Sequence, residues 1–474
     1  YGAMKASGVF LVVNPQVKGA KLAFILKDCN VRVLITGSRA LLAAQSELID
    51  CPDLGHVILA DGAASKLPDA GAALRTAGKS VHSLDELLTA HSREAPDNDN
   101  IELDLASLIY TSGSTGQPKG VMLTHLNMVT AARSITTYLR NESDDIILSA
   151  LPLSFDYGLY QVLMAFLFGG TVVLEKQFAY PQVFLDLIAR ERVTGLPIVP
   201  TITAILLNLK ELDDQDFSSV RYVTNTAQAL PEHHIRTLRR VMPQARIYSM
   251  YGLTECKRVA YLPPELIDAK PTSVGIAIPG TEAWIESEDG RVVTTPGEAG
   301  ELIVRGAHVM PGYWNRPEEN ARYLRPGRYP YERELKTGDL FRQDEDGHLY
   351  FISRKDDLIK TAGGKYVAPQ RLESLLKIHP LINQVLIHGD QKKYIVALLT
   401  LDKTLVEQLG KDRQLHYRVW TDLLEQQPIQ LVRLALHLLR LGRVCGVRIR
   451  RRQLQIALQA SAGVLGPLSF EAVG

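Results

Sequence analysis

The sequence predicts an α/β fold with a largely parallel sheet, followed by a smaller α+β domain. Helix-compatible and β-prone segments alternate between residues 21 and 224, which is the pattern of βαβ units. Short strands separated by turns replace this alternation between residues 283 and 312, as in a small β-barrel or meander. Beyond residue 353 a helix and two strands remain, enough for a second, smaller domain.

The elements of the first half follow from hydrophobic patterning and from the turn residues between apolar runs. The expected strands are 9–13, 31–36, 145–150, 195–199 and 220–224. One expected helix starts near residue 21, and another lies within 41–59 ahead of a further strand. Three more helices are expected at 126–139, 181–190 and 203–209. Residues 61–100 are rich in Ala, Gly, Ser, Asp and Asn, so we expect a surface excursion there.

Turn dipeptides and a charged linker organise the second half. Asp289-Gly290 and Pro296-Gly297 predict turns between the short strands. The expected elements after the linker are a helix at 367–378 and strands at 384–388 and 394–401. The expected organisation is a large N-terminal domain with its small β-barrel at 1–353, a smaller C-terminal domain at 354–428, and a tail at 429–474.

Composition excludes several classes of protein. The 474 residues hold about two to four domains, and 46% hydrophobic with 22% charged residues is typical of a soluble globular chain. A net charge of +1 gives no overall attraction to nucleic acid. The four cysteines are scattered, which fits a reducing cytoplasm and disfavours a disulfide framework or a zinc site. The most apolar run, 162–174, is too short for a membrane span.

The most informative stretch is LIYTSGSTGQPKGVMLTH, residues 108–125. A β-prone run precedes a loop at 111–121 that holds three Gly, four Ser or Thr and one Lys, and a helix is expected from about Thr124. Glycines let the backbone approach an anion, hydroxyl and N–H groups donate to phosphate oxygens, and Lys119 supplies a positive charge. The pattern lacks the G-x-x-x-x-G-K-[ST] order of the commoner phosphate loop.

This loop closely resembles the signature of the adenylate-forming enzymes, which include acyl-CoA synthetases, peptide-synthetase adenylation domains and luciferases. The resemblance extends over about residues 1–400. It implies that the loop holds the β- and γ-phosphates of ATP. The residues assigned to nucleotide contact by this resemblance are Thr111, Ser112, Gly113, Ser114, Thr115, Gly116 and Lys119. Because the chain begins at Tyr1 in mid-domain by its pattern, we expect a part of the first subdomain to precede it.

The segment Tyr251-Gly252-Leu253-Thr254-Glu255 follows a strand-like run. A carboxylate beside a hydroxyl at a strand end suits Mg²⁺, which prefers oxygen ligands. The resemblance implies that Glu255 bears on the metal, that Thr254 contacts phosphate, and that Tyr251 and Gly252 lie by the adenine. Thr226 and Ala227 stand where the family has an adenine-lining turn, with the usual glycines replaced. Lys119, Thr254 and Glu255 are the residues to which the resemblance assigns catalysis.

Two further motifs resemble the family's ribose site and hinge. Asp339, in Thr337-Gly338-Asp339, would accept hydrogen bonds from both ribose hydroxyls, as acidic residues do in other nucleotide sites. RKDDLIKTAGGKYVAP begins at Arg354, which the resemblance assigns to the ribose or phosphates. Asp356 stands where the family pivots its small domain, and the Gly363-Gly364 pair where a pantetheine arm passes. A charged inter-domain linker is the simpler interpretation, and both can hold.

The acid to be activated is left open between two interpretations. Phe155 stands where many acyl-CoA synthetases have His, and Ser154-Phe155-Asp156 resembles the peptide-synthetase pattern whose Asp binds an α-amino group. A buried carboxylate needs a cation, so Asp156 favours an amino acid if it lines the pocket; otherwise it points outward or caps a helix. Residues 360–369 and YGLTECKRVAYLPPE instead resemble long-chain fatty acyl ligases and acyl ligases of bacterial polysaccharide export.

The resemblance implies an ATP-dependent acid–thiol ligase. A small carboxylic acid would form an acyl-adenylate, and the thiol of CoA or of a carrier-protein pantetheine would then take the acyl group. ATP and Mg²⁺ are the implied cofactors, and neither nucleic acid nor a membrane span is expected. The alternatives are an amino-acid adenylation domain, a binder of nucleotide or acyl-adenylate without turnover, and oxidation of the adenylate as in luciferases.

The tail departs from the family, which ends with a catalytic Lys on a mobile loop. The last lysine is Lys411, and between residues 429 and 474 the only acid is Glu471. Arginine recurs there, at positions 433, 440, 443, 448, 450, 451 and 452. An amphipathic or nucleic-acid-touching tail is one interpretation, and a shifted reading frame, which we favour, is the other. No residue of the tail is assigned the role of the catalytic Lys.

Overall fold

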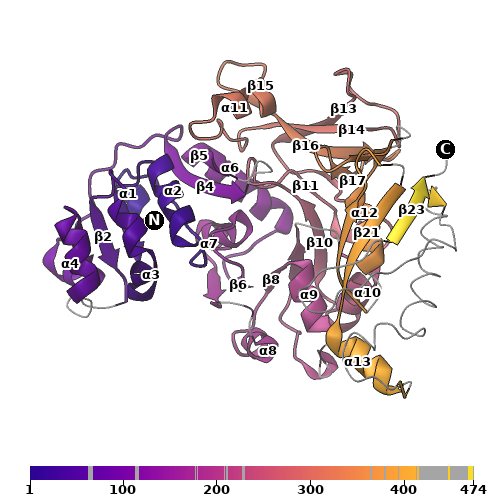
Figure 1. The fold of residues 1–474 in the computed structure, drawn as a ribbon, viewed down its shortest axis with the longest axis horizontal. Helices are drawn as coiled ribbons and strands as arrows, with labels where there is room; N and C mark the ends of the chain where they lie inside the picture. Colours follow the sequence, from indigo (N-terminus) through magenta and orange to yellow (C-terminus); the bar gives the residue numbers. More distant parts are fainter. Residues whose placement is uncertain are drawn as a thin grey trace. The chain divides into compact units, whose positions relative to one another are not determined.

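Figure 1 shows the fold, a computed structural model. The residues that the structure describes are 1–61, 68–112, 117–176, 178, 180–207, 209, 212–226, 230–362, 366–377, 381–392, 394–412, 414–415, 447–448 and 468–472. They divide into a large unit (Tyr1–Trp284, Ile303–Thr337 and Gln343–Tyr350) and a small unit (Ile285–Leu302, Gly338–Arg342 and Phe351–Gly474). No helix of the described residues is both long and apolar enough to cross a membrane.

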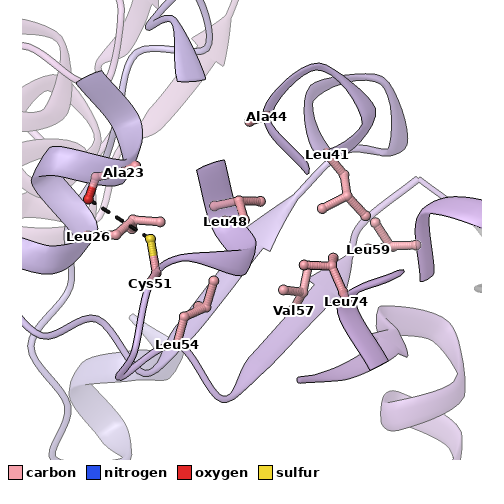
Figure 2. Packing of buried hydrophobic residues seen from close by; sticks show 10 residues of the cluster. All are labelled: Ala23, Leu26, Leu41, Ala44, Leu48, Cys51, Leu54, Val57, Leu59 and Leu74. Atoms are coloured by element: carbon pink, nitrogen blue, oxygen red, sulfur yellow. Dashed lines mark hydrogen bonds between the residues drawn. The ribbon is translucent and has the colours of Figure 1, made fainter. Parts of the chain in front are cut away.

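A three-stranded parallel sheet lies near the beginning of the large unit, with strand order β1-β2-β3. Its strands are β1 (Val33–Thr36), β2 (His56–Leu59) and β3 (Ser80–Ser83). The helices of this region are α1 (Gly2–Lys5), α2 (Gly19–Asp28), α3 (Ser38–Ile49), α4 (Pro68–Thr76) and α5 (Leu84–Ala90). Figure 2 shows its core, in which Leu41, Leu48 and Val57 are each at most 1% exposed.

Two expectations for this region are wrong. The surface excursion expected at 61–100 instead holds α4, β3 and α5, and Leu74 of α4 is 0% exposed in the core. The sequence did not indicate β3 because Ser80-Val81-His82-Ser83 lacks the apolar run of a typical buried strand. Residues 9–13 form no strand in the described part of the chain, where Phe10 makes an isolated bridge to Ser107.

A seven-stranded sheet with strand order β12-β11-β10-β9-β8-β6-β7 forms the centre of the large unit. Its strands are β6 (Ile146–Ser149), β7 (Thr171–Leu174), β8 (Gly195–Ile198), β9 (Tyr222–Asn225), β10 (Arg246–Tyr251), β11 (Ala260–Tyr261) and β12 (Ile276–Ala277). The pairs among β6 to β10 are parallel, whereas β10-β11 and β11-β12 are antiparallel. The predicted α/β class with a largely parallel sheet is confirmed.

Five helices alternate with these strands. They are α6 (His125–Leu139), α7 (Asp156–Phe168), α8 (Pro181–Arg190), α9 (Pro200–Leu207) and α10 (Glu232–Val241). The bounds of α6, α8 and α9 agree with the predicted helices to within a few residues, whereas α7 and α10 were not predicted. Every residue of β8 and β9 is buried, as expected of parallel strands that are covered on both faces. That burial explains why short apolar runs were sufficient to predict them.

The glycine-rich stretch holds a hairpin of two paired strands before the expected helix, where one strand and a long loop were predicted. β4 (Leu105–Ser112) pairs antiparallel with β5 (Pro118–Thr124), and Thr111 lies opposite Lys119. The loop expected at 111–121 is therefore too long, because residues 118–121 are strand. Helix α6 follows directly, and Thr124 and Asn127 form a capping box at its beginning, which stabilises a helix N-terminus.

Five strands form the sheet that corresponds to the expected small barrel or meander. They are β13 (Thr281–Glu286), β14 (Ala299–Gly306), β15 (Leu324–Pro326), β16 (Arg333–Gln343) and β17 (Leu349–Arg354), in the order β13-β14-β16-β15 with β17 on β16. Both predicted turns carry a glycine with positive φ, +82° at Gly290 and +83° at Gly297, where a side chain is disfavoured. Helix α11 (Pro317–Tyr323) precedes β15.

The small unit has its own core. Its four-stranded sheet has the order β20-β21-β23-β22. Its elements are β18 (Ile359–Lys360), β19 (Tyr366–Val367), α12 (Pro369–Lys377), β20 (Ile382–His388), β21 (Tyr394–Leu401), α13 (Lys403–Asp412), β22 (Val447–Arg448) and β23 (Leu468–Ala472). Leu376, Ile395 and Ala397 are almost fully buried in its core. Most of the Arg-rich tail lies outside the described residues.

Candidate active site

The hairpin places Lys119 at the second position of β5. The Lys119 side chain is 9% exposed, and Thr111 is half-buried opposite it on β4. Ser112 ends β4, whereas Gly113, Ser114, Thr115 and Gly116 lie outside the described residues. Contact of these six residues with phosphate stays a prediction. The other residues of the candidate site are described by their position relative to Lys119.

A segment almost two hundred residues later in the chain pairs with β5 and brings aromatic groups to Lys119. The Met122 N–H donates to the Gly312 carbonyl at 3.0 Å, and the Trp314 N–H donates to the Gly120 carbonyl at 2.8 Å. The Lys119 ammonium then lies 5.7 Å from the centre of the Tyr313 ring and 5.8 Å from that of Tyr323. At these distances ring faces attract a cation.

Lys119 also has a carboxylate partner on helix α11. Its Nζ lies 2.7 Å from Oε2 of Glu319, an ion pair in which the Glu319 side chain is 22% exposed. The sequence did not indicate Glu319, Tyr313 or Tyr323 as site residues. The local signal in the sequence is the run Gly312-Tyr313-Trp314-Asn315, which resembles the family but indicates no role for any of its side chains.

Glu255 is joined to Lys119 through Tyr313. The Tyr313 hydroxyl donates to Oε1 of Glu255 at 2.7 Å, while its ring faces the Lys119 ammonium. Burial, together with the Glu255 charge, holds the pKa of Tyr313 well above its usual value, so the phenol stays protonated. The Met310 N–H donates to the Glu255 carbonyl at 2.8 Å. The structure thus brings together two of the predicted catalytic residues.

The turn that carries Glu255 is tightly packed. A Cβ at Gly252 would lie 2.2 Å from the carbonyl oxygen of Lys257, so this position requires glycine. Tyr251 and Thr254 are half-buried beside it. Lys257 has a φ of +62°, and the Val259 N–H donates back to the Tyr251 carbonyl at 2.9 Å. The contacts predicted for Tyr251, Gly252 and Thr254 with nucleotide stay predictions.

Two buried cations follow Glu255. The Lys257 ammonium makes no hydrogen bond to the described residues and lies 5.1 Å from the centre of the Tyr160 ring. Burial lowers its pKa to about 8, against the opposing effect of the Asp156 and Glu255 charges. Arg258 instead donates from Nη1 to Oγ1 of Thr226 at 2.6 Å. The sequence indicated neither cation as part of the site.

The residues predicted near the adenine and the acid are only partly described. Thr226 is buried and bonded to Arg258, whereas Ala227 lies outside the described residues. Phe155 is 59% exposed and is the N-cap of α7, and the half-buried Asp156 is the first residue of that helix. A carboxylate is stabilised there by the helix dipole. The Asp156 charge acts on Lys257, so Asp156 has a cation of the chain itself within electrostatic range.

Asp339 and Arg354 meet within the small unit. Asp339 lies on β16 and is 6% exposed, and its Oδ1 accepts a hydrogen bond from Nε of Arg354 at 3.1 Å. Arg354 ends β17, and the exposed Asp356 follows it in a turn. The proximity of Asp339 to Arg354 is consistent with the prediction that both residues belong to one nucleotide site. The ribose contact and the hinge stay predictions. Residues 363–364 lie outside the described residues.

A cluster with the composition of a metal site holds an ammonium instead. Asp344, Asp346 and His348 present ligand atoms within 4.8 Å of one another. Lys270 Nζ lies 2.6 Å from an oxygen of each carboxylate and 3.1 Å from Nδ1 of His348. The lysine already supplies the positive charge, so the cluster is a structural ion pair network.

Comparison with known proteins gives matches along most of the chain. The family described as AMP-binding enzyme matches residues 1–314, and the AMP-binding enzyme C-terminal domain matches residues 356–427. The long-chain-fatty-acid–CoA ligase of Bacillus subtilis is 32% identical over 411 residues, which are 83% of this chain and 71% of that protein. An L-proline–[L-prolyl-carrier protein] ligase of Streptomyces coelicolor is 34% identical over 318 residues, 64% of this chain.

The chain spans only 57% of that second relative and 55% of 4-coumarate–CoA ligase 1 of Solanum tuberosum. Among solved structures, the O-succinylbenzoate coenzyme A synthetase of Bacillus subtilis in complex with ATP and magnesium ion is similar with a TM-score of 0.65 and 28% identity. That similarity covers 86% of this chain and 78% of the synthetase.

Proposed function

The chain belongs to the AMP-binding enzyme family, and from that premise we propose that it is an acid–thiol ligase. It activates a carboxylic acid with ATP as an acyl-adenylate and transfers the acyl group to the thiol of CoA or of a carrier-protein pantetheine. The observation that supports this best is the arrangement of Lys119, Tyr313 and Glu255, in which one phenol contacts both the ammonium and the carboxylate.

The first step forms a bond between a carboxylate oxygen and the α-phosphorus of ATP and breaks the bond to the β-phosphate oxygen, releasing pyrophosphate. Lys119 and the hydroxyls of the loop offset negative charge on the phosphates, a role that is typical of preorganised sites. In the second step the thiol forms the thioester, losing its proton, and AMP leaves.

Glu255 and Thr254 fit a magnesium site because they are adjacent residues of one turn with a carboxylate and a hydroxyl, and Mg²⁺ prefers oxygen ligands. When bound, Mg²⁺ would neutralise phosphate charge. The hydrogen bond from Tyr313 fixes the Glu255 carboxylate. Asp339 with Arg354 would bind the ribose, and Asp356 would serve as the hinge of a mobile small domain at 354–428. We place this reaction in the cytoplasm.

For the acid we propose a fatty or aryl acid first. Asp156 acts electrostatically on the buried Lys257, which supplies the cation that an α-amino group would otherwise provide. An amino acid is the second candidate, favoured by Ser154-Phe155-Asp156 and by the similarity to the prolyl-carrier ligase.

Pyrophosphate exchange with fatty, aryl and amino acids tests the first step. We expect exchange with at least one acid, followed by AMP release and thioester formation with CoA or a pantetheinylated carrier. Replacing Lys119 with Ala and Glu255 with Gln together should abolish exchange. ATP binding without exchange for any acid would favour the binder without turnover, and light emission or oxygen uptake would favour the luciferase-like alternative.

A further inference from the structure

We propose that Glu319 is a built-in competitor of the ATP phosphates for Lys119. The inference rests on the proposed function, since it takes Lys119 as the phosphate-binding cation. The Glu319 carboxylate pairs with the Lys119 ammonium at 2.7 Å. The β- and γ-phosphates must displace this carboxylate to reach Lys119, and the carboxylate takes the ammonium back when pyrophosphate leaves.

The competing carboxylate is held in place by its helix. Asn320, the next residue of α11, accepts a hydrogen bond from the Tyr313 N–H at 2.6 Å and donates to the Tyr313 carbonyl at 3.1 Å. Arg316, just before α11, pairs with Asp28 at 2.9 Å. The Asn320 contacts hold α11 to the segment that pairs with β5, and the Arg316 ion pair holds its beginning to the end of α2. Glu319 therefore faces Lys119 because of the fold.

The position of the ion pair makes displacement feasible. The Lys119 side chain is 9% exposed, so its ammonium has little water to replace a lost partner, whereas Glu319 at 22% exposure can turn towards solvent. The pair is mostly buried, and the Glu319 Oε2 that faces Lys119 has almost no exposed surface. The cost of desolvating both charges offsets much of their attraction in such a pair. A polyphosphate carries more negative charge and can replace the carboxylate. The Tyr313 and Tyr323 rings would keep the ammonium in position during the exchange of partners.

The competition makes a selective prediction. Two ligands, MgATP and magnesium pyrophosphate, have a pyrophosphoryl group. Their binding affinity should be lowered by the free energy needed to displace Glu319. AMP has only the α-phosphate, so its affinity should be nearly independent of Glu319. A purely structural role of the pair in holding α11 would change the affinities of the three ligands together.

The test is calorimetric titration of the full chain with MgATP, magnesium pyrophosphate and AMP. For Glu319→Gln we expect MgATP and pyrophosphate to bind more tightly, on the order of fivefold, with the AMP affinity within a factor of about two of the wild type. The matched control is Glu318→Gln, which removes the same charge from the neighbouring exposed residue of α11 and should leave all three affinities unchanged.

A second variant separates contact from net charge and guards against misfolding of the first. Glu319→Asp keeps the charge but shortens the side chain, so its MgATP affinity should lie between those of wild type and Glu319→Gln. Equal MgATP affinity in wild type and both Glu319 variants, or equal gains for ATP and AMP, would overturn the inference while leaving the proposed function intact. If the wild type itself binds no MgATP, the proposed function fails and the inference with it.

Discussion

At the scale of single residues, Tyr313 connects the two predicted catalytic groups. Tyr313→Phe keeps the ring on Lys119 but removes the hydrogen bond to Glu255. We expect about 1 kcal/mol lower stability and roughly five- to twentyfold slower pyrophosphate exchange, because the Glu255 carboxylate loses its fixed orientation. Tyr329→Phe, at a tyrosine that is 52% exposed, is the control. Exchange at the wild-type rate in Tyr313→Phe would show that Glu255 needs no such support.

Lys257 makes stability depend on pH. Its pKa is about 8 in the fold against an ordinary 10.5, so between these values the unfolded chain binds more protons. Stability therefore rises with pH from about 8 to 10.5. Below pH 8 the fold bears the full free-energy penalty of burying the charged Lys257 ammonium. Lys257→Met should remove it, stabilising the chain by up to about 3 kcal/mol at pH 7.

Urea unfolding of both chains between pH 7 and 10 measures this effect. The difference in free energy of unfolding should shrink as pH rises, since wild-type Lys257 becomes neutral. The loss of a positive charge near Asp156 and Glu255 offsets part of the gain. A gain that does not depend on pH would contradict the assignment to Lys257 ionisation.

At the scale of elements, Asn127 joins α6 to the turn after β14, which precedes Tyr313. It caps α6 with Thr124, and its Nδ2 donates to the carbonyls of Ala307 and Val309 at 2.8 and 2.9 Å. Asn127→Ala removes the cap and the donor to the carbonyl of buried Val309, so we expect a loss of about 2–3 kcal/mol in unfolding free energy. Thr137→Ala, at an exposed position of the same helix, should change it by less than about 0.5 kcal/mol. Similar values for both variants in chemical denaturation would refute this role.

The helices and strands also show which elements local sequence patterns can predict. α8 was predicted with its observed bounds because Pro181 begins it and its apolar residues recur at helical spacing. β5 was missed because Pro118, Lys119 and Gly120 resemble a loop, although the strand is almost entirely buried. β3 was missed because Val81 is the only apolar one of its four residues. Local patterns therefore indicate elements with clear apolar periodicity and overlook strands whose burial comes from tertiary packing.

The candidate site shows the same limit. Lys119 and Glu255 were predicted from local motifs, whereas Tyr313 and Glu319 became visible only when the fold brought them beside Lys119. Nothing near the loop in the sequence indicates either partner, since the contacts depend on pairing of a distant segment with β5. The cation beside Asp156 was missed for a related reason: its burial is not evident from a charged Lys-Arg dipeptide.

At the scale of the whole molecule, we propose that the small domain at 354–428 changes position between the two steps of the reaction. Asp356, exposed in the turn after β17, is the proposed hinge, and a hinge residue must change its backbone dihedrals. Asp356→Pro fixes φ near −65°. We expect pyrophosphate exchange within about twofold of wild type and thioester formation reduced about tenfold or more, because one of the two arrangements becomes inaccessible.

Asp356→Ala is the matched control, since it removes the same carboxylate but leaves φ free, and both steps should then proceed at nearly wild-type rates. Exchange and thioester formation are measured on the same preparations, with the melting temperature as a check on folding. If Asp356→Pro slows both steps equally, the residue supports the fold rather than the motion. If Asp356→Ala reproduces the Pro phenotype, the carboxylate matters and the backbone freedom does not.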